Sequence, residues 1–328
     1  MKYLITGATG FIGPHLVKTL VSNGHSCRCL VRNKSKTDSL KELGIELVEG
    51  DIKEANTLKG IANGMDRVLH MATLGHMSNF TVTESMFEAI NVQGTQNVMA
   101  EALRAGVPRI VHCSTVAAMG ICEEVPATER SNCKPHHPYG RSKWKAEQTI
   151  LALVREKKLP AVIVRFSMVY GPGDTRDILK LTRLAKKGLF PKVGNKPKLT
   201  PLIYVDDAIQ GLLLAAEKGK IGETYLLTNK ESIPFDDLRK ILQSALETKR
   251  LPLYVPEWMA TTVASLVEKT FPLIGKVPPV SRKNIESTLA DRVFSIEKAQ
   301  KEFGFNPQVD PEMGLRETVL WYKEQGWV

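Results

Sequence analysis

The sequence predicts an α/β protein with a doubly wound parallel sheet, followed by a smaller and mostly helical C-terminal part. The first observation is that, up to Phe166, short apolar runs typical of buried strands alternate with longer stretches of helical periodicity. The second is a glycine-rich turn between the first strand and the first helix. Strands that alternate with helices pair in parallel through right-handed crossovers, so helices cover both faces of the sheet.

The first half of the chain carries these elements in regular order. Buried strands are expected at Lys2–Thr6, Ser26–Val31, Ile45–Glu49, Arg67–Ala72, Arg109–Cys113 and Ala161–Phe166. Helices are expected at Ile12–Ser22, from about Met86 to Ala105, and at Pro138–Glu156.

The rhythm changes after Gly171, where a Gly-Pro-Gly loop begins. The segment from Phe235 to Val328 is expected to be mostly helical and to cover the carboxyl ends of the sheet, where open α/β sheets bind their ligands. Between these points we expect helices at Asp177–Lys187 and Asp206–Glu217 and strands at Ile203–Val205 and Thr224–Leu227.

The composition is that of an ordinary globular protein, since 43% of the 328 residues are hydrophobic and 24% are charged. The net charge of +10 is spread along the chain without a basic tract, which argues against a nucleic-acid partner. The five cysteines have no metal-type spacing, so we expect no metal site and reduced thiols in a cytoplasmic protein. The longest apolar region, Leu251–Leu273, contains Glu257, Glu268 and Lys269 and is a poor candidate for a membrane span.

The glycine-rich turn predicts an anion site. Gly7, Gly10 and Gly13 follow the first strand at three-residue intervals, and the helix begins at Ile12. Free backbone N–H groups and the positive end of the helix dipole would face a pyrophosphate. Glycine permits the unusual dihedral angles of the turn and the close approach of the phosphate. Because a strand–helix–strand pattern surrounds the turn, it indicates a dinucleotide site.

A second group of residues suggests proton transfer. Tyr139 and Lys143 are four residues apart and would share one face of a helix. A tyrosine has a pKa of about 10, and a cation held nearby would lower that pKa toward a useful range. Ser114 and Thr115 end the fifth strand and would face the same crevice, so this cluster is a candidate catalytic site.

These motifs together resemble the extended short-chain dehydrogenase/reductase family, also described as NAD-dependent epimerase/dehydratase-like, whose nucleotide-binding part has the Rossmann fold. The matching segments cover nearly the whole chain: Gly7-Ala-Thr-Gly-Phe-Ile-Gly13, Gly50-Asp51-Ile52, His70-Met-Ala72, Asn91-Val-Gln-Gly-Thr95, Ser114-Thr115, Pro138-Tyr139, Ser142-Lys143, Val169-Tyr-Gly-Pro-Gly173 and Tyr204-Val-Asp-Asp207. We therefore expect a dinucleotide-binding Rossmann domain over 1–172, with returning elements near 202–228. Residues 173–201 and 229–328 would form a substrate-binding cap.

The resemblance also implies roles for individual residues. Tyr139 would be the general acid/base, Lys143 would lower its pKa and hold the nicotinamide ribose, and Thr115 would hydrogen-bond the substrate oxygen. Ser114 is the weaker alternative for the hydroxyl role. The residues expected to bind the cofactor are Gly7, Gly10, Phe11, Ile12, Gly13, Arg32, Lys36, Asp51, Ile52, Ala72, Thr73, Asn91, Ser114, Tyr139, Lys143 and Phe166.

The end of the second strand favours NADP(H) over NAD(H). A carboxylate there would bind the adenosine ribose and repel a 2′-phosphate. The chain instead carries Arg32, Lys34 and Lys36 and no carboxylate. An arginine can stack on adenine and pair with a phosphate through its planar fork. A solvated basic loop is the alternative, so NAD(H) stays possible.

Three functions remain open on the sequence. The favoured one is an NADP(H)-dependent oxidoreductase that interconverts a secondary alcohol and a ketone on an apolar or moderately sized substrate. The alternative is a nucleotide-sugar epimerase or dehydratase with tightly bound NAD. Family members that dehydrate sugars carry an Asp-Glu pair where this chain has Val116 and Ala117, and Thr200 stands where an Arg often contacts the diphosphate. A non-catalytic dinucleotide-binding regulator is the third, although such proteins typically lose the Tyr or the Lys.

The apolar segment Leu251–Arg282 resembles the cap of 3β-hydroxysteroid dehydrogenase-like and dihydroflavonol reductase-like members. Such a lid would suit an apolar substrate. The same segment could instead be core, a dimer contact or a peripheral membrane contact, of which the last is not favoured. Family members often form homodimers through the helix that carries the Tyr, so we expect a homodimer.

Overall fold

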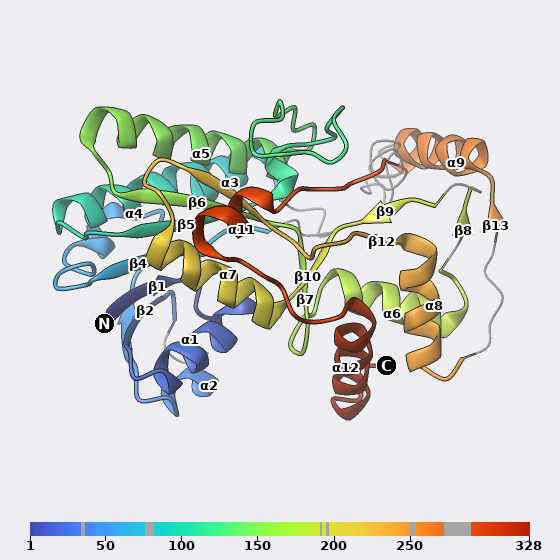
Figure 1. Ribbon diagram of the computed structural model, residues 1–328, viewed down its shortest axis with the longest axis horizontal. Helices are drawn as coiled ribbons and strands as arrows, with labels where there is room; N and C mark the ends of the chain where they lie inside the picture. The colour runs from blue at the N-terminus through green and yellow to red at the C-terminus, as the bar shows by residue number, and fades with distance from the viewer. Residues whose placement is uncertain (34–36, 76–81, 191, 195–196, 249–253, 272–289) are drawn as a thin grey trace.

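The computed structural model describes the chain except for residues 34–36, 76–81, 191, 195–196, 249–253 and 272–289 (Figure 1). Its centre is a seven-stranded sheet in the order β11-β6-β5-β4-β1-β2-β3, in which each pair of neighbours is parallel. The predicted doubly wound α/β fold is therefore confirmed. The strands are β1 Lys2–Thr6, β2 Ser26–Val31, β3 Glu46–Glu49, β4 Arg67–His70, β5 Ile110–Thr115, β6 Ala161–Phe166 and β11 Thr224–Leu227.

The order of the strands positions the site. The chain runs outward from β1 through β2 to β3 and then crosses back to β4 on the other side of β1. Loops that follow β1 and β4 therefore diverge, and a crevice forms at the carboxyl ends of these two strands.

Helices cover both faces of the sheet (Figure 1). On one face α1 (Ile12–Ser22) packs beside α7 (Val205–Lys218), and both belong to one apolar cluster with β1 and β2. On the other face α4 (Gly94–Arg104) and α5 (Pro138–Lys157) pack over a second cluster. Most side chains of the central strands β1, β4, β5 and β6 are buried on both faces, as expected for a parallel sheet, whereas the edge strand β3 has none that is fully buried.

One predicted helix differs from the structure. The stretch expected from about Met86 to Ala105 consists of a short helix α3 (Glu84–Phe87), a π-helical turn η3 (Glu88–Gln93) and then α4. The wider turn holds Asn91, whose buried amide group bonds to two separate segments. Turns of this kind are frequent at functional sites, and apolar periodicity carries no signal for them.

The C-terminal part is mostly helical, as predicted. The strands outside the main sheet form three short two-stranded sheets. Its helix α9 leaves Trp258, Val263 and Leu266 exposed and buries Ala264. The described part of the apolar segment therefore does not pack as core. Within the described residues, no helix is both long and apolar enough to cross a membrane.

The remaining elements outside the main sheet are α2 Asp38–Lys41, η2 Ala55–Leu58, η4 Val116–Ala118, β7 Met168–Tyr170, α6 Asp177–Lys187, β8 Lys192–Val193, β9 Leu199–Thr200, β10 Leu202–Tyr204, β12 Ile233–Pro234, α8 Phe235–Ala245, β13 Tyr254–Val255, α9 Glu257–Thr270, α11 Glu297–Phe303 and α12 Pro311–Glu324.

Candidate active site

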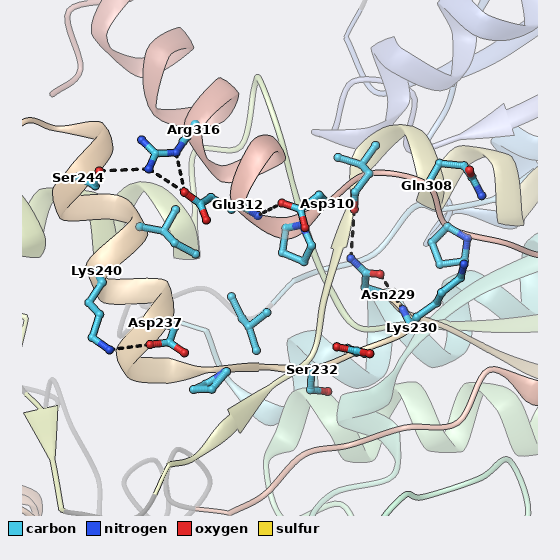
Figure 2. Close-up of a pocket in the computed structure, with 17 residues that line it drawn as sticks. Asn229, Lys230, Ser232, Asp237, Lys240, Ser244, Gln308, Asp310, Glu312 and Arg316 are labelled. Atoms are coloured by element: carbon cyan, nitrogen blue, oxygen red, sulfur yellow. Dashed lines mark hydrogen bonds and ion pairs between the residues drawn. The ribbon is translucent and has the colours of Figure 1, made fainter.

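A large open cavity of about 790 Å³ lies in the C-terminal part, between α8, β12 and the start of α12 (Figure 2). Two pairs of oppositely charged side chains lie on its wall. Lys240 lies 2.7 Å from the carboxylate of Asp237, and Arg316 lies 2.7 Å from that of Glu312. These pairs are exposed to solvent, and they satisfy one another without a ligand.

A smaller cavity of about 380 Å³ opens at the carboxyl ends of β1, β2, β3 and β4. Its volume lies within the range typical of ligand pockets. Most of the residues that the sequence assigns to the cofactor line it, namely Gly7, Gly10, Phe11, Ile12, Gly13, Arg32, Asp51, Ile52, Ala72 and Thr73.

The three glycines of the turn are required for different reasons. Gly7 has a φ of +79°, and a Cβ there would lie 2.7 Å from the backbone nitrogen of Ala72. A Cβ on Gly13 would overlap the carbonyl of Ala8. At Gly10 the sole protein atom within 4 Å of a Cβ is the Gly7 carbonyl oxygen, at 3.2 Å. Packing alone therefore explains Gly7 and Gly13, whereas a ligand held against the turn explains Gly10, so these residues fit a dinucleotide.

Arg32 is exposed at the end of β2, on the wall of this cavity. Its guanidinium makes no hydrogen bond or ion pair with the residues that the structure describes. Lys34 and Lys36 lie outside the described residues. Asp51, after β3, supplies a carboxylate to the same wall and accepts a 3.0 Å hydrogen bond from the backbone of Lys53.

Tyr139 lies in the first turn of α5, directly after Pro138. His137 caps the helix, because its Nδ1 atom accepts a hydrogen bond from the backbone of Tyr139. The next residue must be small, because a Cβ on Gly140 would overlap the carbonyl of Ala117. This close approach brings the start of α5 to the end of β5. The hydroxyl groups of Thr115 at the end of β5 and of Thr73 after β4 consequently lie close enough to the phenol of Tyr139 to affect its pKa.

The electrostatics of Tyr139 differ from the expectation. Burial raises the pKa of Tyr139 to about 12, against the smaller lowering effects of the Arg176 charge and of the neighbouring Thr115 and Thr73 hydroxyl groups. At neutral pH the phenol therefore keeps its proton and can act as an acid. The predicted lowering of this pKa by Lys143 is not seen, and the nearest effective cation is Arg176.

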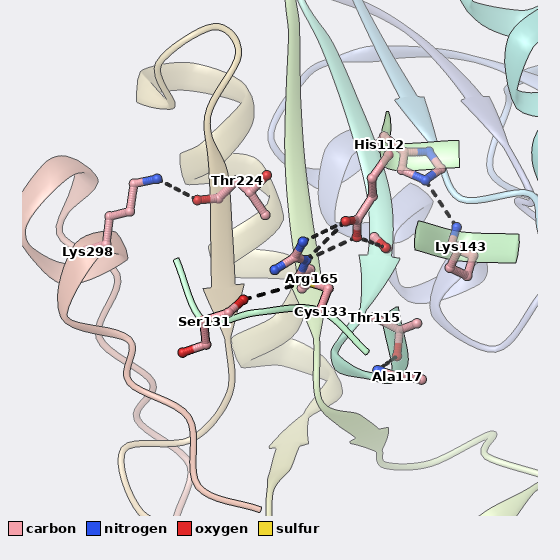
Figure 3. A network of polar contacts seen from close by, with 11 residues as sticks. His112, Thr115, Ala117, Ser131, Cys133, Lys143, Arg165, Thr224 and Lys298 are labelled. Atoms are coloured by element: carbon pink, nitrogen blue, oxygen red, sulfur yellow. Dashed lines mark hydrogen bonds and ion pairs between the residues drawn. The ribbon is translucent and has the colours of Figure 1, made fainter. Parts of the chain in front are cut away.

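Lys143 explains this difference, because its side chain turns toward the sheet. The buried ammonium donates hydrogen bonds to the Cys113 carbonyl at 2.8 Å and to His112 Nε2 at 3.2 Å (Figure 3). Burial lowers the pKa of Lys143 to about 8. The cation and the phenol thus share a helix, as their spacing predicted, while the ammonium is held on β5.

Asn91 links several walls of the site. Its side-chain oxygen accepts hydrogen bonds from Thr73 at 2.9 Å and from the Leu74 backbone at 2.7 Å. Its amide nitrogen donates to Ser142 at 2.9 Å. The buried side chain therefore fixes the loop after β4 against α5, on which Tyr139 lies.

Two residues expected at the cofactor lie elsewhere. Ser114 donates a hydrogen bond to buried Glu147, whose carboxylate pairs with Arg165 at 2.7 Å (Figure 3). Phe166 is buried in the core at the end of β6. Successive strand residues point to opposite faces, so when Thr115 faces the crevice Ser114 faces away from it. Neither residue lines the smaller cavity.

Arg176 was missed by the sequence analysis. It lines the smaller cavity, yet it comes from the loop between β7 and α6, far along the chain from the glycine turn. The available signal was a cation three residues after Gly173, the last residue of the Gly-Pro-Gly loop.

Comparisons with known proteins agree with this geometry. A family model described as the NAD dependent epimerase/dehydratase family matches residues 3–227. The 2-alkyl-3-oxoalkanoate reductase of Stenotrophomonas maltophilia is 30% identical over 335 residues, which cover 96% of this chain and 98% of the relative. The putative dihydroflavonol 4-reductase of Synechocystis sp. is 30% identical over 340 residues, 99% of this chain and 96% of the relative. A solved structure of DesIV, a dTDP-glucose 4,6-dehydratase from Streptomyces venezuelae with NAD and TYD bound, is similar with a TM-score of 0.81 and 27% identity, covering 100% of this chain and 98% of that one.

Proposed function

The chain belongs to the NAD dependent epimerase/dehydratase family, as its motifs predicted, and we propose that it is an oxidoreductase that interconverts a ketone and a secondary alcohol. One observation carries the proposal: the hydroxyl groups of Thr73, Thr115 and Tyr139 converge beside the cavity that fits a dinucleotide. Relatives named as reductases of a 3-oxoalkanoate and of a dihydroflavonol support it.

The proposed chemistry divides between cofactor and protein. When bound, a reduced nicotinamide supplies the hydride that the substrate carbon gains. Tyr139, protonated at neutral pH, donates the proton that the substrate oxygen gains. Thr115 already accepts a 3.2 Å hydrogen bond from the Ala117 backbone, so its own hydroxyl hydrogen is directed to the substrate or to Tyr139. The Arg176 charge and the Thr115 hydroxyl stabilise the phenolate that remains.

The residues after Thr115 support a reductase over a dehydratase. Val116 and Ala117 form the turn η4 and have no group that can move a proton. A nucleotide-sugar epimerase or dehydratase remains the second candidate, because of the likeness to DesIV. Such an enzyme would need a second acid or base from another segment.

We propose NADP(H) as the preferred cofactor, with Arg32 on the 2′-phosphate. An apolar substrate under a C-terminal cap, the division of the chain at residue 172, a homodimer and a cytoplasmic location remain predictions of the sequence.

The test is the Tyr139→Phe variant, assayed by NADPH oxidation with a panel of apolar ketones. We expect NADPH binding to be retained and turnover to fall by about 10²- to 10⁴-fold, the usual contribution of general acid catalysis. Tyr254→Phe is the matched control, because that tyrosine is exposed in the C-terminal part. Unchanged turnover in Tyr139→Phe would refute the proposed role.

A further inference from the structure

Arg176 lies on the wall of the cavity of about 380 Å³. It precedes α6 and belongs to the loop after β7, whereas the glycine turn on the same wall follows β1. Its Nη1 atom lies 3.6 Å from the position that a Cβ on Gly75, in the loop after β4, would take. The guanidinium therefore lies beside the loop after β4.

The cations of this wall lie on two sides of the glycine turn. In the main sheet β1, which the turn follows, has β4 on one side and β2, then β3, on the other. Arg32 follows β2, and Lys53 comes after β3, where its ammonium lies 3.8 Å from the carboxylate of Asp51. Among the residues described on this wall, Arg176 is the cation on the β4 side.

The loop that carries Arg176 lies against the first turn of α1. His15 of α1 donates a 2.8 Å hydrogen bond to the carbonyl of Pro172. A Cβ on Gly173 would lie 3.6 Å from a ring carbon of Phe11, the residue before α1. Because α1 begins at the glycine turn, these contacts hold the loop at the anion-binding end of this helix.

The guanidinium of Arg176 keeps its donors available. The buried carboxylate of Asp174 accepts a 3.0 Å hydrogen bond from the backbone of Arg176, which fixes the position of that backbone. The Nε atom lies 3.8 Å from the same carboxylate oxygen, which is too far for a hydrogen bond. Among the residues that the structure describes, the side chain makes no hydrogen bond, and 51% of its surface is exposed. A ligand in the cavity can therefore reach it.

A pyrophosphate bound at the glycine turn has negative charge on both of its phosphates. Backbone N–H groups of the turn and the end of α1 approach it from one side. An arginine matches phosphate oxygens through its planar fork and always carries its charge. A cation on an adjacent loop can thus bind the oxygens that the backbone leaves to solvent.

We propose that Arg176 binds the pyrophosphate of the cofactor and holds the dinucleotide against the glycine turn. The inference rests on the proposed function and adds a binding residue to the same cavity. Arg32 and Arg176 then have separate tasks. Arg32 recognises the 2′-phosphate, which NAD(H) lacks, whereas Arg176 binds a group that both cofactors share. Arg176 therefore sets the affinity for both cofactors and leaves the choice between them to Arg32.

The experiment titrates NADPH and NADH into the wild-type enzyme and three variants, with nicotinamide fluorescence as the readout. Arg176→Gln should bind both cofactors about tenfold or more weakly, as for the loss of a charge-assisted hydrogen bond, and should keep the ratio of the two affinities. Arg32→Gln should weaken NADPH binding and leave NADH binding unchanged. Arg183→Gln is the matched control and should bind as the wild type does, because this arginine lies further along α6 and outside the described wall of the cavity.

Urea denaturation separates binding from folding. Because the side chain of Arg176 makes no described hydrogen bond, Arg176→Gln should unfold at the same urea concentration as the wild type. A loss of stability in this variant would assign a structural role to Arg176 and overturn the proposal.

The remaining outcomes separate this inference from the proposed function. Unchanged NADPH affinity in Arg176→Gln, a changed ratio of the two affinities in that variant, or an equal loss in Arg183→Gln would overturn the assignment of Arg176 and leave the role of Tyr139 standing. If the wild type binds one of the two cofactors alone, the loss for that cofactor decides. A wild-type enzyme that binds neither cofactor would overturn the proposed function as well.

Discussion

Two cavities of the molecule, the one between α8 and α12 and the one at the carboxyl ends of the strands, differ in more than their size. The larger one, of about 790 Å³, is lined by loops and by the exposed faces of α8 and α12. The smaller one, of about 380 Å³, lies at the carboxyl ends of four parallel strands. Lys240 and Arg316 beside the larger cavity each pair with a surface carboxylate, whereas the side chains of Arg32 and Arg176 on the wall of the smaller one have no described hydrogen-bond partner.

This difference shows that the candidate active site lies where the ends of several helices and strands come together. Around Tyr139, hydroxyl groups from three segments come together. Thr73 follows β4, Thr115 ends β5, and Tyr139 lies at the start of α5. The buried side chain of Asn91 uses both its oxygen and its nitrogen in hydrogen bonds that hold this geometry. A pocket between surface helices has no comparable framework.

The largest expected effect concerns the buried ion pair behind the site. Glu147→Ala leaves Arg165 charged and buried, so the free energy of unfolding should fall by about 3–5 kcal/mol. Glu312→Ala removes a surface partner of Arg316 beside the larger cavity and should change stability by less than about 1 kcal/mol. Urea denaturation of both variants measures this, and equal losses would remove the contrast between the two regions.

The next effect is a loss of stability in mild acid. Buried His70 bridges Thr6 at 2.7 Å and Thr95 at 2.9 Å, and burial, with the Lys143 charge, lowers the pKa of His70 to about 3. The unfolded chain takes up this proton below a pKa of about 6.5, so the folded state loses stability as the pH falls from about 6.5 toward 3. For this one histidine the slope is about 1.4 kcal/mol per pH unit.

Urea denaturation between pH 7.5 and 5 tests this expectation. His25, which is only half-buried, provides the control, since His25→Asn should leave the slope unchanged. A flat stability profile in the wild type would contradict the neutral, buried state of His70.

A smaller effect is expected on cofactor choice. Arg32→Asp places a carboxylate at the end of β2, which would repel a 2′-phosphate and bind a free ribose. The ratio of kcat/KM for NADPH over NADH should fall by about tenfold or more, in line with the loss of a charge-assisted bond. Arg32→Lys should keep the preference for NADPH. If Arg32→Asp leaves the ratio unchanged, the phosphate is bound by other residues.

The sequence predicts what is local in the chain. Short spacings in the sequence predict the glycine turn, the alternation of strands and helices, and the position of Tyr139 on a helix. The structure contains each of them. Glycine at position 10 is informative because packing does not demand it.

The features that could not be predicted from the sequence depend on contacts between segments that lie far apart in the chain. Arg176 lies on a loop that hydrogen bonds of His15 and Asp174 hold at the cavity. No residue spacing in the sequence predicts that this loop lies beside the glycine turn. Lys143 shares a face with Tyr139, but the Cys113 carbonyl on a neighbouring strand captures its ammonium. The direction in which a long side chain turns is set by such tertiary partners, so the electrostatics of Tyr139 could not be inferred from its own helix.

The central claim is that the smaller cavity binds the nicotinamide cofactor, and a titration of NADPH into two variants tests it most directly. Gly10→Ala adds a methyl group on the cavity wall with a single near protein contact, at 3.2 Å. Arg316→Ala alters the wall of the larger cavity. We expect Gly10→Ala to stay folded by circular dichroism and to bind NADPH about tenfold or more weakly, the loss of roughly one charge-assisted contact, while Arg316→Ala binds as the wild type does. Full affinity in Gly10→Ala together with weakened binding in Arg316→Ala would contradict the claim.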